Sequence, residues 1–194
     1  MRIVSGGQSG VDQAALDAAI ALGISYGGWV PKGGWAENFQ DPPGLLTKYP
    51  KMVETEASDP AERTKLNVRD SDATIILVQS NDQGELPGTK LTLETAHRLG
   101  RPSLTVAVGD LDAAARLRQW LSDRSEKRPI RTLNVAGPRE SEAQGLYTKA
   151  KSLLETALRP MLPASDANCH ESYAPSAAPE TLQGCPTCKP ETAP

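Results

Sequence analysis

The residues of this chain best suited to chemistry lie in a glycine-rich loop near the amino terminus. Residues 2–4 are a short apolar stretch, residues 5–10 read Ser-Gly-Gly-Gln-Ser-Gly, and an alanine-rich helix is expected to begin at Val11. Main-chain N–H groups and the positive end of a helix dipole both face such a loop, and glycines let a phosphate approach the backbone closely. The loop therefore predicts an anion-binding site. The residues assigned to it are Gly6, Gly7, Gln8, Ser9, Gly10 and Asp12.

The loop matches neither of two familiar phosphate-binding motifs. A P-loop requires Gly-Lys-Ser/Thr, whereas Gly10 is followed by Val11 and Asp12. The dinucleotide fingerprint Gly-x-Gly-x-x-Gly is also unmatched, and residues 27–30 offer no acidic side chain for a ribose hydroxyl. The sequence therefore argues against NAD as a cofactor. The alternative that the loop binds no ligand stays open, because Ser9 and Asp12 have the spacing of a capping box and could satisfy the start of the helix by themselves.

Further polar residues lie in turns that could meet the first loop at one edge of a parallel sheet. Lys32 could neutralise an anion, and Arg139 could contact a phosphate or carboxylate with two N–H groups. Asn67 lies four residues after Arg63 on a charged, helical segment, so both could reach a ligand. Ordinary roles as surface residues, or as a helix cap for Thr89, stay open. The residues that extend the predicted binding site are Lys32, Asn67, Gly88, Thr89, Gly137 and Arg139.

Alternating strands and helices must position these residues. Residues 73–78 form a continuous apolar run with β-branched side chains, which predicts a central strand buried on both faces. Residues 103–108 and 131–136 predict further strands, each followed by a helical pattern. Small residues at helical spacing in segment 11–22 would let that helix lie close to the sheet. The alternation predicts an α/β fold with a mainly parallel sheet.

Length, charge and composition limit the functional classes. The chain has 194 residues and a formal net charge of −3, which suits one domain and supplies no basic stripe for nucleic acid. No apolar run approaches the roughly 20 residues of a membrane span, and the amino terminus has no signal-peptide pattern. We therefore expect a cytoplasmic protein with neither nucleic acid nor membrane as a partner.

Near the carboxyl terminus the composition changes to Pro, Ala, Ser, Glu and Thr without periodicity. We expect a domain over residues 1–160 and a flexible, disordered tail over residues 161–194. All three cysteines lie in this tail, at Cys169, Cys185 and Cys188. The predicted core therefore has no disulfide framework. With His170 the cysteines could supply zinc ligands, but the adjacent pair Cys169 and His170 is poorly spaced to chelate one ion, and we predict no metal site.

Several segments together closely resemble the family of molybdenum cofactor (molybdopterin) carrier proteins, namely residues 5–17, 28–33, 63–72 and 133–141. The resemblance spans most of residues 1–160, and its order of motifs is similar to the circularly permuted branch of the Rossmann-like nucleotide-binding proteins. That wider group includes the cytokinin-activating phosphoribohydrolases. The chain departs from the family at residues 34–37, Gly-Trp-Ala-Glu, where more basic residues are common.

The resemblance implies a Rossmann-like three-layer fold and a cytoplasmic homo-oligomer, dimer or tetramer, that carries molybdenum cofactor and hands it on, with molybdoenzymes as partners. The cofactor brings a phosphate for the glycine loops and a polar pterin that Asn67 could read. Its metal sits on the cofactor's own dithiolene, so the carrier needs no cysteine or histidine ligand.

Two other functions stay open. The phosphoribohydrolase relatives hydrolyse the N-glycosidic bond of a nucleotide monophosphate, and they share Pro-Gly-Gly-x-Gly-Thr-x-x-Glu with the acid three residues after the threonine. Here Glu94 stands five residues after Thr89, and the two extra residues turn it by roughly 200° around a helix, away from the direction of the relatives' acid. We therefore assign no catalytic residue, although Asp12 or Glu94 could act in another geometry. A sensor of nucleotide derivatives such as ADP-ribose would use the same loops.

Overall fold

The computed structural model describes residues 1–80 and 86–162. Its strands are β1 (Arg2–Val4), β2 (Ser25–Gly27), β3 (Trp29–Val30), β4 (Val53–Glu54), β5 (Ala73–Val78), β6 (Ser103–Ala107) and β7 (Thr132–Ala136). Its helices are α1 (Val11–Ala21), α2 (Pro60–Arg69), α3 (Pro87–Arg98), α4 (Ala113–Lys127) and α5 (Leu146–Leu158), with short 3₁₀ helices at Gly44–Thr47 and Arg159–Met161. From residue 163 onward the predicted tail, with its cysteines and the zinc ligands considered for it, lies outside the described residues. Within the described residues, no helix combines the length and apolar character needed to cross a membrane.

Five strands form one parallel sheet in the order β2-β1-β7-β5-β6, while β3 and β4 pair separately. The α/β fold with a parallel sheet is therefore confirmed. All six residues of β5 are buried, as its apolar run predicts, but β7 and not β5 takes the middle position. The position of a strand within the sheet depends on pairing between distant segments, which the hydrophobic pattern of a single strand does not encode.

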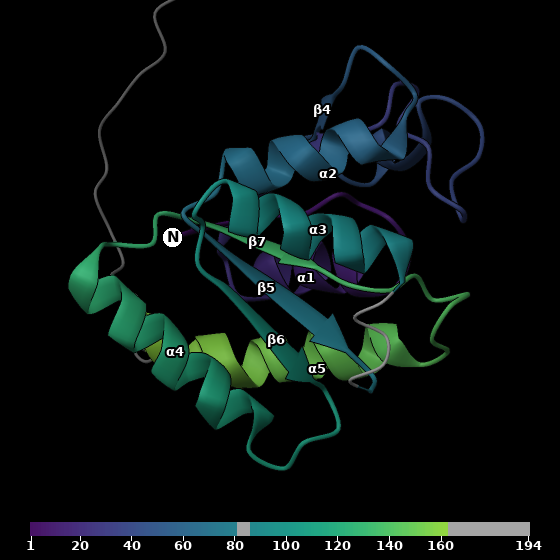
Figure 1. Cartoon of the computed structure of the whole chain (residues 1–194). Coiled ribbons are helices and arrows are strands. Elements are labelled where there is room, and N and C mark those ends of the chain that lie inside the picture. The colour runs from purple at the N-terminus through teal and green to yellow at the C-terminus, as the bar shows by residue number, and fades with distance from the viewer. Residues whose placement is uncertain (81–85, 163–194) are drawn as a thin grey trace, which may run out of the picture. The chain divides into compact units, whose positions relative to one another are not determined.

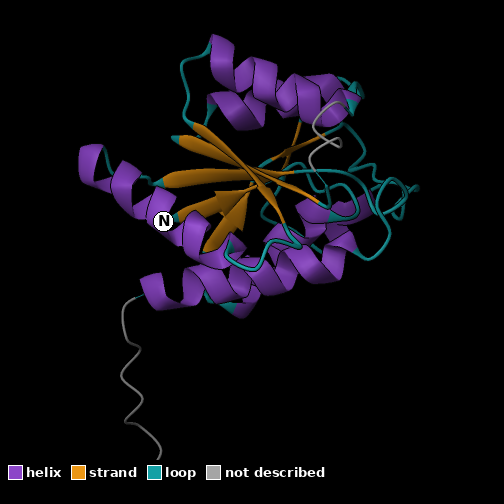
Figure 2. Ribbon diagram, turned by 60° about the horizontal axis from the view of Figure 1, so that its bottom comes forward, coloured by secondary structure: helices purple, strands orange, loops and turns teal. Residues whose placement is uncertain are grey.

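Helices cover both faces of the sheet, which confirms the three-layer arrangement. Figures 1 and 2 show α2 and α3 over one face, and α1, α4 and α5 over the other. Alternate residues of β5 point to opposite faces, as in any strand. Ile75 and Leu77 join the main hydrophobic core beside α1, α4 and α5, while Ile76 and Val78 form a small apolar cluster with Leu93 of α3 packed against it.

The layer beneath α2 and α3 contains many buried polar side chains. Those with at most 8% exposure include Thr64, Asn67, Thr74, Thr92, Thr95 and Asn134. Asn134 of β7 donates a long hydrogen bond of 3.4 Å to Thr74 of β5. The sheet is therefore covered asymmetrically, with an apolar layer on one side and a partly polar layer on the other.

On the apolar side, Asp17 of α1 connects three segments. The hydroxyls of Tyr49 and Tyr147 donate to its carboxylate at 2.9 and 2.7 Å, and Lys48 Nζ lies 2.9 Å away. Burial by itself would raise the pKa of Asp17, but the hydrogen bonds from Tyr147, Lys48 and Tyr49 hold it below its ordinary value. Burial, with the hydrogen bond to Asp17 and its negative charge, raises the pKa of Tyr147 to about 12. Asp17 therefore fixes α1 to both α5 and the segment that follows the first 3₁₀ helix.

We expect Asp17→Asn to lower the free energy of unfolding at neutral pH by about 1–3 kcal/mol, because charge-assisted hydrogen bonds are lost. The pKa of Asp17 is lowered on folding, so its stabilisation is complete above the unfolded pKa and disappears as the pH falls through the folded pKa. The variant should therefore lose less stability than the wild type between about pH 5 and pH 2. Urea unfolding followed by circular dichroism measures both effects.

The matched control is Asp112→Asn, which removes a carboxylate whose side chain is 65% exposed. It should change the free energy of unfolding by less than about 0.5 kcal/mol. Equal losses in the two variants would show that Asp17 does not connect the segments as described.

Candidate functional site

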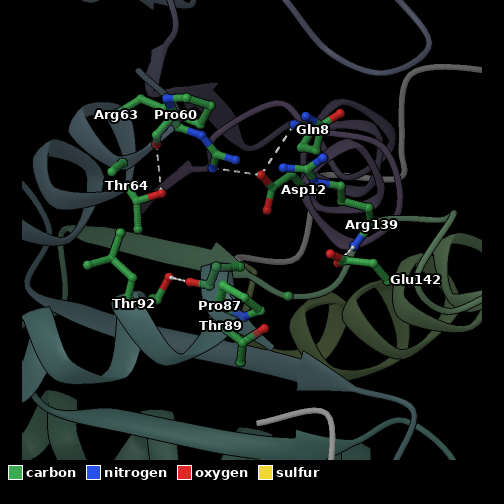
Figure 3. A pocket seen from close by; sticks show the side chains of 15 residues that line it. Gln8, Asp12, Pro60, Arg63, Thr64, Pro87, Thr89, Thr92, Arg139 and Glu142 are labelled. Atoms are coloured by element: carbon green, nitrogen blue, oxygen red, sulfur yellow. Dashed lines mark hydrogen bonds and ion pairs between the residues drawn. The ribbon is translucent and has the colours of Figure 1, made fainter. Parts of the chain in front are cut away.

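A cavity of about 340 Å³ lies at the carboxyl edge of the sheet, within the size range of small-molecule sites. Its walls come from the loops after β1 and β7 and from the first turns of α1, α2 and α3 (Figure 3). The polar residues that line it are Gln8, Asp12, Arg63, Thr64, Thr89, Thr92, Arg139 and Glu142. Because the amino-terminal ends of three helices face the same space, their dipoles favour an anion there.

The first turn of α3 has unused hydrogen-bonding capacity. Among the described residues no side chain caps this helix, which begins at Pro87 after the N-cap residue Leu86. Thr89 is only 3% exposed, lines the cavity, and its hydroxyl has no hydrogen-bond partner among the described residues. On α2, by contrast, the Asp59 side chain already accepts the N–H of Ala61 at 2.9 Å. A buried hydroxyl without a partner is costly, so this end of α3 is suited to a polar ligand atom.

A buried ion pair forms the wall of the cavity opposite α3. Arg63 Nη1 of α2 donates to Asp12 Oδ2 of α1 at 3.1 Å, and the main-chain N–H of Gln8 donates to the same oxygen at 3.2 Å (Figure 3). Burial raises the pKa of the Asp12 carboxyl above its ordinary value, although Arg63 and Gln8 act in the opposite direction. The Nε atom of Arg63 is buried and has no partner among the described residues.

The glycines of the first loop serve contacts within the protein. A Cβ atom at Gly6 would lie 1.6 Å from Arg63 Nη1, so the guanidinium lies directly against the backbone where a side chain would otherwise stand. Gly10 has φ +76°, and a Cβ there would lie 2.5 Å from the carbonyl oxygen of Pro138. The group that lies closest to Gly6 is thus the guanidinium of Arg63, and the group that lies closest to Gly10 is the backbone of the loop after β7.

Two N–H groups of this loop also have partners within the chain. Gln8 donates its N–H to Asp12, and the N–H of Ser9 donates to the Gln8 side-chain oxygen at 3.1 Å. The hydroxyl of Ser9 donates to Glu37 and does not cap α1, whose N-cap residue is Gly10. The capping-box reading of Ser9 is therefore wrong, although Asp12 does accept a main-chain N–H.

The structure brings half of the predicted binding residues to the cavity. These are Gln8, Asp12, Gly88, Thr89, Gly137 and Arg139. Figure 3 shows the Arg139 side chain directed toward the same end of the cavity as Gln8 and Asp12. The predicted meeting of turns at one sheet edge therefore occurs, with contributions from segments more than a hundred residues apart.

The other predicted residues lie outside this cavity. Gly6 lines a small adjoining space of about 10 Å³, and Lys32 is exposed. Both ends of the Asn67 amide bind the main chain of Trp29, at 2.8 Å to its N–H and 3.0 Å to its carbonyl. Asn67 therefore attaches α2 to β3.

The last three, Gly7, Ser9 and Gly10, do not line the cavity either. A Cβ at Gly7 would meet Leu45 at 2.9 Å, which places this residue against the packed interior.

Sequence reasoning left some cavity residues out of the binding set. Arg63 was placed on a helix, but its partner Asp12 is 51 positions away and only the fold brings them together. No pattern in the sequence indicated that Thr92 and Glu142 would line a binding site. Glu94 is exposed and does not line the cavity, in agreement with the helical rotation calculated from its spacing to Thr89. In residues 1–80 and 86–162, no group of three or more His, Cys, Asp and Glu side chains is arranged to hold a metal ion.

Comparison with known proteins supports this reading of the fold. The model of a family described as "Circularly permutated YpsA SLOG family" matches residues 3–158. The chain is also similar to the crystal structure of a "Putative molybdenum carrier protein" from Syntrophus aciditrophicus SB, with 36% sequence identity and a TM-score of 0.69. That match covers 81% of this chain and 94% of the other. No curated protein matches the chain.

We expect Arg63→Met to lower the free energy of unfolding by about 3–5 kcal/mol, because Asp12 is left as an unpaired buried carboxylate. Loss of the guanidinium raises the pKa of Asp12 further, so the folded state binds a proton that the unfolded state releases. The destabilisation should therefore grow as the pH rises from about 4 to 8. Chemical denaturation at several pH values measures it.

Arg116→Met is the matched control, since its ion pair with Asp110 has both side chains more than 40% exposed. This variant should lose less than about 1 kcal/mol with little dependence on pH. Adding Asp12→Asn to Arg63→Met should recover part of the stability, and a double variant no more stable than Arg63→Met would contradict the buried-pair interpretation.

Proposed function

The chain belongs to the circularly permuted YpsA SLOG family, and we propose that it is a binding protein for a phosphorylated small molecule held in the cavity at the carboxyl edge of the sheet. The carrying observation is the first turn of α3, which no described side chain caps, together with the buried hydroxyl of Thr89, which has no partner among the described residues. A phosphate oxygen there would accept the hydroxyl proton and face the positive end of the helix dipole. In open parallel sheets, ligands bind at this same edge.

Two arginines support the assignment of an anionic ligand. Arg63 and Arg139 line the cavity from different loops and helices, and the guanidinium of Arg63 is held in place by Asp12. A guanidinium fixed in this way offers directed N–H donors without a large loss of side-chain entropy on binding. The acidic residues Asp12 and Glu142 on the same walls accept hydrogen bonds from the protein itself.

Within this class, we propose the phosphorylated pterin of the molybdenum cofactor as the cargo, with the protein acting as its carrier. The similar protein from Syntrophus aciditrophicus SB is described as a molybdenum carrier, and the chain covers nearly all of it. The polar walls suit a pterin ring with several donors and acceptors, and the phosphate would lie at Thr89. The metal would stay on the dithiolene of its own cofactor. We further propose a cytoplasmic homo-oligomer that passes the cofactor to molybdoenzymes.

A second candidate function is hydrolysis of a nucleotide N-glycosidic bond. The observation that favours it is the carboxyl of Asp12, which lines the cavity and has a pKa raised by burial, as general acids often do. Its pairing with Arg63 and Gln8 favours the role of a positioning group. A sensor of nucleotide derivatives would differ from a carrier only in what happens after binding.

We expect Thr89→Val to weaken binding of AMP, used as the phosphorylated probe, by about 10–100-fold, because a hydrogen bond to a charged oxygen is lost. The variant should unfold at the same temperature as the wild type or higher, since a buried hydroxyl without a partner is removed. Isothermal titration calorimetry and thermal unfolding measure the two effects.

Thr95→Val provides a closely matched control. Thr95 lies on the same helix, is 1% exposed and also has an unpartnered hydroxyl, but it does not line the cavity. Its variant should keep full affinity for AMP. Equal losses of affinity in the two variants would place the phosphate elsewhere.

Native mass spectrometry distinguishes carrier from enzyme. We expect the purified protein to retain molybdopterin mass after exposure to molybdenum cofactor, and to release no free base from AMP. Release of base that is abolished by Asp12→Asn but not by Glu94→Gln would instead establish the hydrolase. Retention of neither molybdopterin, AMP nor ADP-ribose would overturn the binding function.

A further inference from the structure

Beside the cavity, the carboxylate of Glu37 is held by donors from two loops. The Ser9 hydroxyl donates to Oε1, and Ser141 donates its N–H to Oε1 at 3.3 Å and its hydroxyl to Oε2 at 2.7 Å. Burial by itself would raise the pKa of Glu37, but these hydrogen bonds and the charge of Arg139 hold it below its ordinary value. The Glu37 carboxylate is thus an anion that the protein's own hydrogen-bond donors hold.

The donors belong to the loops that close the carboxyl edge of the sheet. Ser9 lies after β1, while Arg139 and Ser141 lie after β7. Glu37 comes from neither loop, and it does not line the cavity, whereas Arg139 does. Arg139 thus lines the cavity, and its charge also acts on the neighbouring Glu37 carboxylate.

A phosphate can use every one of these donors. Hydroxyl groups, main-chain N–H groups and guanidinium groups bind phosphate oxygens as they bind carboxylate oxygens, and a phosphate monoester carries up to twice the charge. We propose that Ser9 and Ser141, with the charge of Arg139 nearby, form an oxyanion subsite, filled by Glu37 in this structure, in which a phosphate group displaces the Glu37 carboxylate. The proposal rests on the proposed binding function and adds the second group of residues that a phosphate would contact.

Displacement requires movement of the side chain alone. The N–H of Glu37 donates to the Gln8 side-chain oxygen at 2.8 Å, and the neighbouring Asn38 exchanges two hydrogen bonds with Gln13 at 2.8 and 2.9 Å. These contacts do not involve the Glu37 carboxylate. The main chain around Glu37 therefore stays attached to the start of α1 when the carboxylate turns away.

The test is chemical rescue of Glu37→Ala by inorganic phosphate. This variant leaves the donors of Ser9 and Ser141 without their acceptor, so it should unfold at a lower temperature than the wild type. Phosphate at about tenfold above its Kd for the variant should then raise the unfolding temperature of the variant by about 4 °C more than that of the wild type. Adding Ser141→Ala to Glu37→Ala should abolish the rescue.

Glu140→Ala is the matched control from the same loop. Glu140 accepts the main-chain N–H groups of Gly145 and Tyr147, so its loss also destabilises, but phosphate should not rescue it. If phosphate raises the unfolding temperature of wild type and Glu37→Ala equally, or of neither, the subsite does not exist. Should Glu37→Ala fail to fold, Glu37→Gln keeps the shape of the side chain, and its phosphate affinity, measured by ³¹P NMR, must exceed that of the wild type at least about tenfold.

ADP-ribose identifies the source of the phosphate. AMP has a single phosphate, which Thr89 would bind, so the deciding ligand is ADP-ribose, which has two. If the subsite serves the cavity ligand, Glu37→Ala binds ADP-ribose more tightly than the wild type does; if it serves free phosphate, ADP-ribose affinity is unchanged while the rescue persists. Adding Thr89→Val to Glu37→Ala should leave the phosphate rescue intact. Rescue without any binding of AMP or molybdopterin would contradict the proposed function alone, and AMP binding without rescue would contradict the subsite alone.

Discussion

Asp12 and Arg63 belong to helices on opposite faces of the sheet, and their ion pair joins the two helical layers at the carboxyl edge. Asp12 is buried and Arg63 is partly buried, so the Asp12 carboxylate depends on the guanidinium, and removing Arg63 alone carries a large penalty. Gly6 makes it possible, because any side chain at this position would occupy the space of the guanidinium. The wall of the cavity, the orientation of Arg63 and the contact of the first loop with Asp12 all follow from this one interaction.

The two faces of the sheet have different roles in the protein. On the side of α1, α4 and α5, continuous apolar packing and the Asp17 cluster supply stability. On the side of α2 and α3 the apolar cluster is small, and threonine and asparagine side chains are buried beside unpartnered hydroxyls. Polar groups that are costly in an ordinary core are useful where a polar ligand is bound. The layer with the smaller apolar cluster accordingly contains α2 and α3, whose first turns line the cavity.

Local patterns in the sequence were sufficient to predict the strands and helices, and the edge of the sheet at which the loops meet. The apolar run of β5 and the turn before α3 correctly indicated a buried strand and Thr89 at the cavity. The glycine loop was harder to interpret, because a glycine that admits a phosphate and one that admits an arginine look identical in sequence. The same applies to Asn67, whose amide was expected to contact a ligand and instead binds the main chain of Trp29. Such partners are set by pairings across tens of residues, and local spacing does not contain them.

The place of β7 in the sheet has a consequence for how the chain acquires its structure during synthesis. Among the strands that the structure describes, β7 is the last to leave the ribosome, yet it lies between β1 and β5 and pairs with both. Until residues 132–136 emerge, the β2-β1 pair and the β5-β6 pair have no strand to connect them, and each keeps an unpaired edge. Completion of the sheet is therefore delayed until most of the described chain has been made, and between the synthesis of residue 107 and that of residue 132 both pairs present an open edge.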